Sequence, residues 1–117
     1  PLWLGIDGID MDEQIASELM VNQSTGILVV GIISDGPADK AGLEGGYRIT
    51  DINGTQIELG GDIIITADMQ PIENLRDMST YISNNKIEGD TISLGILRDG
   101  KPQEIDVTLE ARPMNER

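Results

Sequence analysis

A glycine between apolar residues lies near the start of this sequence, in the tetrapeptide Trp3-Leu4-Gly5-Ile6. Glycine permits a sharp backbone turn, so that consecutive N–H groups can point at a single spot. Such a nest of amides binds anions, and an anion that suits it is the terminal carboxylate of a peptide. Short apolar runs with one glycine are common, so the interpretation depends on the rest of the chain. We take the backbone amides of Leu4, Gly5 and Ile6 as candidate carboxylate donors.

Catalytic chemistry is hard to build from the side chains of this sequence. There is no histidine and no cysteine, which excludes Ser-His-Asp and Cys-His sites and zinc sites made from those ligands. A Ser-Lys pair would need a lysine inside a pocket, whereas Lys40, Lys86 and Lys101 stand in turn-like or charged surroundings. We therefore expect no catalytic residue in this chain.

Acidic residues gather at Asp7, Asp10, Asp12 and Glu13 and raise the question of a calcium site. Their spacing differs from that of an EF-hand loop, and no glycine stands at the required turn. A solvated start of a helix is the favoured interpretation, because acidic side chains stabilise that end. The sequence also lacks a phosphate loop and a dinucleotide fingerprint. We expect neither a metal site nor a cofactor.

The chain has 117 residues and a net charge of −13, with 38% apolar residues and no phenylalanine. This length suits one domain with an aliphatic core. The negative charge argues against nucleic acid and anionic membrane surfaces, since both attract lysine and arginine. No apolar run approaches the ~18 residues of a membrane span, and no signal peptide is recognisable. Because structured sequence begins at Pro1, we expect a domain of a longer protein whose targeting segments lie elsewhere.

The elements that must position the glycine loop are mostly strands. Runs of β-branched and aliphatic residues, bounded by turn signals, predict strands over residues 2–7, 26–33, 47–52, 55–57, 62–66, 90–98 and 103–109. The pairs Asn53-Gly54 and Asp99-Gly100 suit tight hairpin turns, and Met69-Gln70-Pro71 predicts another turn.

Three helices are expected between these strands, through residues 15–19, over residues 38–41 and through residues 75–82. Asp10 or Asp12 can cap the first, Gly42 ends the second, and Asn74 can cap the third. The sequence therefore predicts a mainly β fold with helices (α+β), in which a partly open barrel or sandwich of about five to six strands is capped by two to three helices.

Three further segments come after the glycine loop in order, at residues 34–43 (SDGPADKAGL), 60–64 (GGDII) and 97–101 (LRDGK). Together with the loop at residues 3–6, they resemble the PDZ domain of the HtrA/Deg serine protease family, of the bacterial and archaeal, circularly permuted type. The resemblance covers nearly the whole chain. It implies that the last strand, at residues 104–109, takes the place of the first strand of animal signalling PDZ domains.

The sequence departs from the compact family pattern between the short helix and the segment GGDII. Residues 44–59 intervene there and contain an Asn-Gly turn, so we expect an inserted hairpin. The pairs Gly45-Gly46 and Gly60-Gly61 begin two similar segments, which leaves a local duplication as the alternative. We expect one PDZ domain over residues 1–111 and a flexible tail over residues 112–117.

The resemblance implies a groove between a strand and a helix, where an extended peptide adds to the strand edge through main-chain hydrogen bonds. The terminal carboxylate of the peptide would bind the N–H groups of Leu4, Gly5 and Ile6, and a small or medium apolar C-terminal residue would fill the pocket. The residues expected to line the groove are Trp3, Leu75, Met78 and Ile82, with Leu4 and Ile6 as its floor. A core-facing stripe is the alternative for the three helix residues, since their spacing suits both roles.

The resemblance further implies a peptide-binding module of an HtrA-like serine protease, which regulates or feeds a separate protease domain. Its partners would be polypeptide C-termini or unfolded segments and its own protease domain, and the isolated domain would be monomeric. Such a protein would act outside the cytoplasm, in the periplasm, at the cell surface or anchored to a membrane by regions outside this chain. Two alternatives remain open: a PDZ module of another parent, such as a membrane metalloprotease or a secretion component, and a non-binding scaffold used in oligomer packing.

Overall fold

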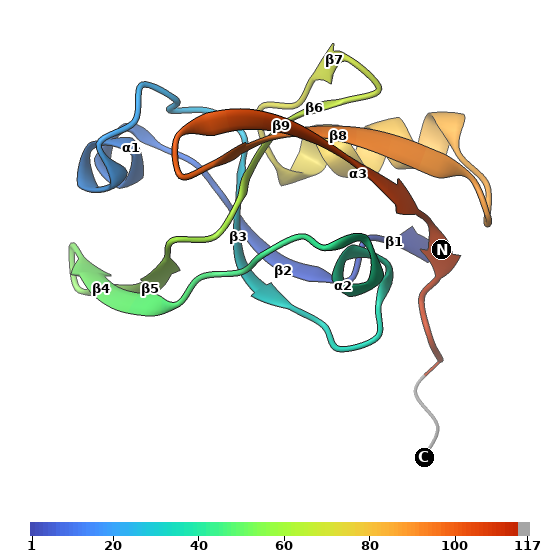
Figure 1. Ribbon diagram of the computed structural model, residues 1–117, viewed down its shortest axis with the longest axis horizontal. Helices are drawn as coiled ribbons and strands as arrows, with labels where there is room; N and C mark the ends of the chain where they lie inside the picture. Colours follow the sequence, from blue (N-terminus) through green and yellow to red (C-terminus); the bar gives the residue numbers. More distant parts are fainter. Residues whose placement is uncertain (115–117) are drawn as a thin grey trace.

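The structure is a computed structural model that describes residues 1–114. The strands are β1 (Leu2–Trp3), β2 (Ile6–Asp10), β3 (Ile27–Ile32), β4 (Arg48–Ile52), β5 (Thr55–Leu59), β6 (Ile63–Ala67), β7 (Gln70–Pro71), β8 (Thr91–Arg98), β9 (Lys101–Thr108) and β10 (Glu110–Ala111). The helices are α1 (Glu13–Leu19), α2 (Pro37–Ala41) and α3 (Leu75–Asn85). A central sheet has the order β2-β3-β6-β8-β9, with β7 pairing to β6 (Figure 1). The pairs β1-β10 and β4-β5 form two further small sheets.

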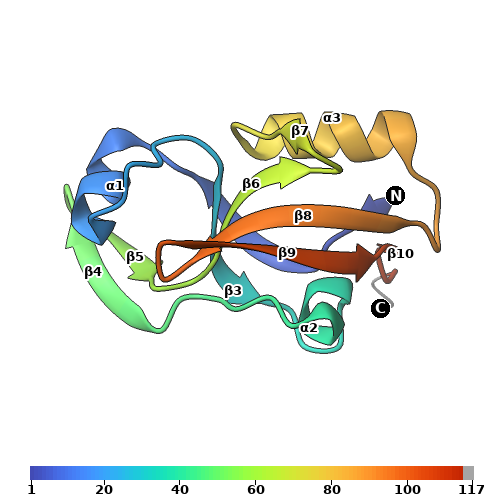
Figure 2. The ribbon, with the colours of Figure 1, turned by 45° about the horizontal axis from the view of Figure 1, so that its top comes forward.

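Helices and the small sheets surround this central sheet. Helix α3 lies along one side of it, near β6 and β8, while α2 packs against β9 on the other side (Figure 2). Helix α1 and the β4–β5 hairpin share one end of the domain, and the pair β1-β10 lies with the chain ends at the other. Within residues 1–114, every helix is too short or too polar to cross a membrane.

Strands β3 and β6 are buried on both faces, which divides the core into two apolar clusters. Val29 of β3 belongs to the larger cluster, whereas its neighbour Leu28 belongs to the smaller one. Ile64 and Ile63 of β6 divide in the same way, as the two-residue period of a strand requires. The larger cluster includes residues of α2 and α3, and the smaller one joins α1 to the β4–β5 hairpin. This double burial explains the uninterrupted apolar runs in the sequence.

The helix caps lie where the sequence predicts them. Asp12 accepts a hydrogen bond of 2.8 Å from the amide of Ile15 at the start of α1. Asn74 accepts one of 2.8 Å from the amide of Asp77 at the start of α3. Gly42 ends α2 in the left-handed conformation, with φ at 93°. These local interactions fix the ends of the helices. Among them, α3 is the helix that borders the expected groove.

Residues 44–59 hold the β4–β5 hairpin, which pairs with no other strand among the described residues. Its turn has positive φ at both Asn53 and Gly54, as a type I′ turn requires. The amide of the Asn53 side chain donates to Oε1 of Gln14 at 2.7 Å and so ties the hairpin to α1.

A buried ion pair fixes the base of this hairpin. Asp62 is 1% exposed, and Arg98 donates to it from Nε at 2.8 Å and from Nη2 at 2.7 Å. The amide of Glu44 donates to the same carboxylate at 2.9 Å, and Arg98 also donates to the carbonyl of Gly42 at 2.9 Å. The bidentate pairing satisfies a carboxylate that would otherwise be costly to bury.

The structure corrects two details of the expected fold. The strand expected over residues 2–7 is divided by Leu4 and Gly5, because β1 pairs with β10 whereas β2 pairs with β3. The turn expected at residues 69–71 lies one residue earlier, at Asp68 and Met69 with φ of 49° and 68°, and Gln70–Pro71 pairs with β6. The central sheet is open, which agrees with the expected partly open architecture. The fold class, mainly β with three helices, is confirmed.

The C-terminal segment is still held in place at Arg112, the first residue of the expected flexible tail. Its amide donates to the carbonyl of Pro1 at 2.9 Å, and its guanidinium carbon lies 5.4 Å from the centroid of the Trp3 ring. Residues 115–117 of that tail lie outside the described residues.

Candidate functional site

The free edge of β2 is the first component of the candidate site. β2 is the terminal strand of the central sheet and pairs only with β3 among the described strands. The amide of Ile33 donates to the carbonyl of Gly5 at 3.0 Å, beside the pair Ile6–Ile32. That bond makes Ile6–Ile32 a non-hydrogen-bonded pair, in which the N–H and C=O of each residue point away from the other strand. The main-chain groups of Ile6 therefore face the open edge.

Helix α3 runs beside this edge. The amide of Leu75 donates to Oδ1 of Asp10 at 2.7 Å, which ties the start of the helix to the end of β2. A Cβ atom built on Gly8 would lie 3.4 Å from both Cδ1 of Ile6 and Cδ2 of Leu75. The side chains of the strand and the helix thus converge over Gly8. An open strand edge next to a helix has the geometry that accepts an added peptide strand.

The Leu4-Gly5 loop connects β1 to β2 and orients the backbone at the head of this edge. Gly5 has φ at 79°, and a Cβ there would lie 3.1 Å from Cδ of Pro37 and 3.3 Å from Cα of Gly36. The carbonyl of Leu4 accepts from the amide of Ala38 at 2.8 Å. Neither the Leu4 amide nor the Gly5 amide donates to an acceptor within residues 1–114. The loop therefore holds two N–H groups without a partner among the described residues, on two buried residues next to the outward amide of Ile6.

A hollow of about 310 Å³ lies between β1 and the second half of α3. Its lining residues are Pro1, Leu2, Ser79, Ile82, Ser83 and Lys86. Ile82, one of the residues expected to line the groove, is among them. Sequence reasoning missed Leu2 and the two serines, because polar residues on a helix face carry no distinctive pattern.

The other expected groove residues occupy three different environments. Leu75 is 40% exposed and lies beside β2, at the position expected for a groove wall. Met78 is 4% exposed and belongs to the larger core cluster. Leu4 is also buried in that cluster, and Ile6 packs against it. Ile82 is 8% exposed and belongs to the same core cluster as Met78, although it also lines the hollow. Of the three helix residues, Leu75 alone is exposed beside β2, so the core-facing alternative describes Met78 and most of Ile82.

Trp3 lies on the face of β1 opposite to the hollow. Successive side chains of a strand point to opposite faces, and Leu2 is the β1 residue that lines the hollow. The Trp3 ring instead faces the guanidinium of Arg112, and its Nε1 is buried without a hydrogen-bond partner among the described residues. Leu2, rather than Trp3, is therefore the residue of β1 that lines this hollow.

Asp68 anchors the C-terminal half of α3 to the sheet. It lies 2.7 Å from Nζ of Lys86, accepts from the Tyr81 hydroxyl at 2.6 Å, and accepts from the Ser93 amide at 2.8 Å. Partial burial opposes ionisation, but the bonds from Lys86, Ser93 and Tyr81 outweigh it and lower the pKa of Asp68 to about 2. The Lys86 charge is therefore already paired, which leaves backbone amides as the anion-binding groups of this site.

Comparison with known proteins decides the family. Residues 4–109 match the sequence family described as PDZ domain. The chain belongs to the PDZ domain family. The match includes the Leu4-Gly5 loop, β2 and α3, so the groove between β2 and α3 lies inside the recognised domain.

Curated relatives of this PDZ domain are parts of longer proteins. It is 32% identical over 111 residues to probable periplasmic serine endoproteases DegP-like from Marinomonas sp. (strain MWYL1) and from Pseudomonas savastanoi pv. phaseolicola. Each match covers 95% of this chain and 20% of the relative, so the chain spans about a fifth of their length. The resemblance to HtrA/Deg proteins predicted from the sequence is confirmed.

Solved structures agree with this assignment. The HtrA-type protease AlgW with a decapeptide has a TM-score of 0.72 and 26% identity, with 97% of this chain and 30% of that chain covered. The HtrA3 PDZ domain bound to a phage-derived ligand has a TM-score of 0.70, with 94% and 86% covered. Its 15% identity supports the fold alone.

Proposed function

We propose that this PDZ domain is the peptide-recognition module of an HtrA-type serine protease. It binds polypeptide C-termini or extended segments by adding them as a strand to the edge of β2. The single observation that carries the proposal is the open edge of β2 facing α3, with the outward main-chain groups of Ile6 at its head. The bound peptides named for two related HtrA-type structures support it.

The terminal carboxylate binds at the amides of Leu4, Gly5 and Ile6. This assignment is supported by the two unused loop donors and by the outward amide of Ile6. Hydrogen bonds to a charged acceptor are worth about 1.5–3 kcal/mol each, so a few of them dominate the affinity of a short peptide. The C-terminal side chain enters the hollow beside Leu2 and Ile82.

The parent protein carries catalysis in a separate serine protease domain, which this module regulates or supplies with substrate. The DegP-like names of the relatives support this assignment. Their description as periplasmic supports an extracytoplasmic location for the parent. We further propose that residues 1–111 form the complete binding unit and that the isolated unit is monomeric.

Amide NMR spectra of the domain, titrated with a short peptide that ends in a free C-terminal valine, test the proposal. We expect the largest shifts at Leu4 to Ile6 and along α3 near Ser79. Strand β9, the other edge of the central sheet, serves as the internal control and should stay unchanged. Shifts of equal size at both edges would show non-selective strand pairing, and an absence of shifts would favour a closed scaffold.

A further inference from the structure

The open-edge strand β2 carries an exposed acid, Asp7, in its middle. Asp7 forms no ion pair within residues 1–114. Its partner on β3 is Gly31, where a Cβ would lie 3.2 Å from Oδ2 of Asp7. The paired position on β3 therefore has no side chain that could neutralise this carboxylate. The other cross-strand position beside Asp7 belongs to whatever strand occupies the open edge.

Main-chain groups alternate along β2 with the period of a regular strand. At one end the Gly5 carbonyl accepts from the Ile33 amide, and at the other the Met11 amide donates to the Gly26 carbonyl at 2.9 Å. Gly5 and Met11 are six residues apart, so every second residue between them also turns its main chain toward β3. Asp7 is one of these residues.

The register shift in the β2–β3 pairing leaves this alternation intact, because its extra residue, Val30, lies on β3. Ile6 and Gly8 therefore turn their main chains toward the open edge. Their side-chain positions lie on the face beside α3, where the Ile6 and Leu75 side chains converge. The Asp7 side chain lies on the opposite face, since successive side chains of a strand alternate.

A peptide whose carboxylate binds at the head of this edge has its register fixed. Its last residue exchanges main-chain hydrogen bonds with Ile6, so its penultimate residue lies opposite Asp7. The two form a non-hydrogen-bonded pair, with Cα atoms about 4.5 Å apart and side chains on the same face. A lysine or arginine at this peptide position is long enough to reach the carboxylate above Gly31, whereas an acidic residue meets a like charge.

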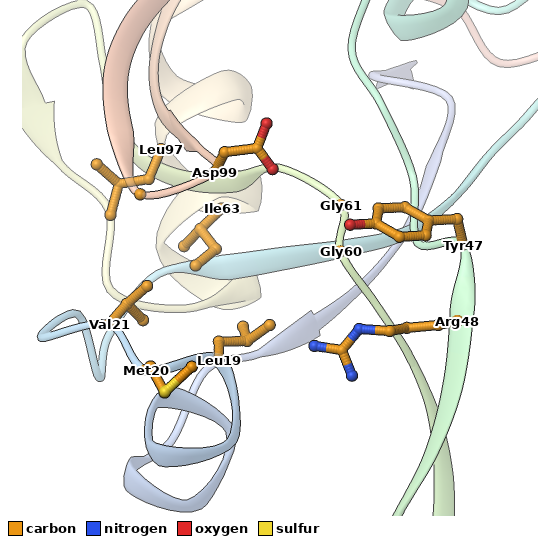
Figure 3. A pocket seen from close by; sticks show the side chains of 11 residues that line it. Leu19, Met20, Val21, Tyr47, Arg48, Gly60, Gly61, Ile63, Leu97 and Asp99 are labelled. Carbon is orange, nitrogen blue, oxygen red and sulfur yellow. The ribbon is translucent and has the colours of Figure 1, made fainter.

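The sign of the charge beside the edge of β2 is unmixed. Strand β2 carries two acids, Asp7 and Asp10, and no base. A second hollow, of about 220 Å³, lies where α1 and the β4–β5 hairpin meet the β8–β9 turn, and it is lined by both Asp99 and Arg48 (Figure 3). That hollow favours neither sign of charge, whereas the edge of β2 favours a cation.

We propose that this domain selects peptides with lysine or arginine next to an apolar C-terminal residue, and that Asp7 is the residue that determines this specificity. The inference rests on the proposed function, because its register follows from the carboxylate site. The Asp7 pair adds to the affinity that the main chain and the terminal carboxylate supply. Cross-strand pairs of opposite charge are modest, so we expect a gain of up to about fivefold in Kd over a neutral penultimate residue.

Three tetrapeptides test the proposal: acetyl-Ala-Val-Lys-Val, acetyl-Ala-Val-Ala-Val and acetyl-Ala-Val-Glu-Val, each with a free C-terminus. Amide NMR titration gives Kd for each. A salt concentration of ~0.1 M, with a Debye length of about 10 Å, screens charges far from the groove. We expect the lysine form to bind about fivefold more tightly than the glutamate form, with the alanine form between them.

Two variants locate the origin of this preference. Asp7→Asn should reduce the ratio of the glutamate and lysine Kd values to less than about twofold. Asp106→Asn, which removes an exposed acid from β9 at the other edge of the sheet, should leave the ratio unchanged.

Equal affinities for the lysine and glutamate forms would overturn the proposal. A ratio that survives in Asp7→Asn, or that falls equally in Asp106→Asn, would do the same. In each of these cases the alanine form still binds, so the proposed function stands and the role of Asp7 is refuted alone. If none of the three peptides binds, the proposed function fails, and the inference fails with it.

Discussion

Replacing Gly5 by alanine should separate the binding role of the loop from its contribution to stability. Gly5 has φ at 79°, where an alanine is strained by about 1–2 kcal/mol. Gly100 has a similar φ of 76°, and a Cβ there meets nothing within 4 Å. Gly100→Ala therefore introduces comparable backbone strain far from the groove and is the matched control.

The two variants should differ in affinity for a peptide with a free C-terminus. A Cβ at Gly5 lies 3.1 Å from Cδ of Pro37 and 3.3 Å from Cα of Gly36, so the loop and these neighbours must move apart by a few tenths of an ångström. We expect this shift to move at least one amide away from the carboxylate. Losing one charge-assisted hydrogen bond costs about 1.5–3 kcal/mol, which weakens Kd about 10- to 150-fold. Fluorescence anisotropy of a labelled peptide measures Kd, and urea unfolding measures the free energy of unfolding. If both variants bind like the unaltered chain while losing similar stability, the loop is not the carboxylate site.

The contacts around the site lead to three further predictions. Arg98→Met leaves the buried Asp62 without its partner and should lower the free energy of unfolding by about 3–5 kcal/mol in urea; a loss below about 1 kcal/mol would refute this role of the pair. The folded-state pKa of Asp68 is depressed from 3.8 to about 2, so its stabilising effect is present above pH 3.8 and is lost as the pH falls toward 2. The stability of Asp68→Asn should therefore fall less across that range, and parallel acid unfolding curves would contradict the assignment. Ser79→Leu should narrow the hollow and shift preference toward small C-terminal residues in a peptide array, while Thr80→Leu, on a different face of α3, should leave preference unchanged.

Local signals predicted much of the fold from the sequence. The caps of α1 and α3 depend on side chains within three residues of the amide that they bind. Asn74 was therefore recognisable in isolation, whereas Asp12 was one of two candidates with Asp10, which instead accepts from the Leu75 amide. The hairpin turn at Asn53-Gly54 depends on two adjacent residues and was equally recognisable. The order of motifs was sufficient to identify the family.

The detailed lining of the groove depends on partners that are distant in sequence. The spacing of Leu75, Met78 and Ile82 defines one helix stripe, but packing against distant strands leaves Leu75 exposed and buries Met78 and Ile82 in the core cluster. Leu2 and Trp3 alternate across a strand whose orientation is set by pairing with β10, at the opposite end of the chain. The residues that line the hollow could therefore be identified only from the tertiary structure, because no local sequence pattern distinguishes Leu2 from Trp3.

The most direct test of the carboxylate site compares one peptide in two forms, with a free and with an amidated C-terminus. Isothermal titration of both against the unaltered domain measures the contribution of the terminal charge alone. We predict that amidation weakens binding tenfold or more, because a tenfold change needs only about 1.4 kcal/mol, less than one lost charge-assisted hydrogen bond. Equal affinities for the two forms would contradict the role of the Leu4, Gly5 and Ile6 amides as the carboxylate site.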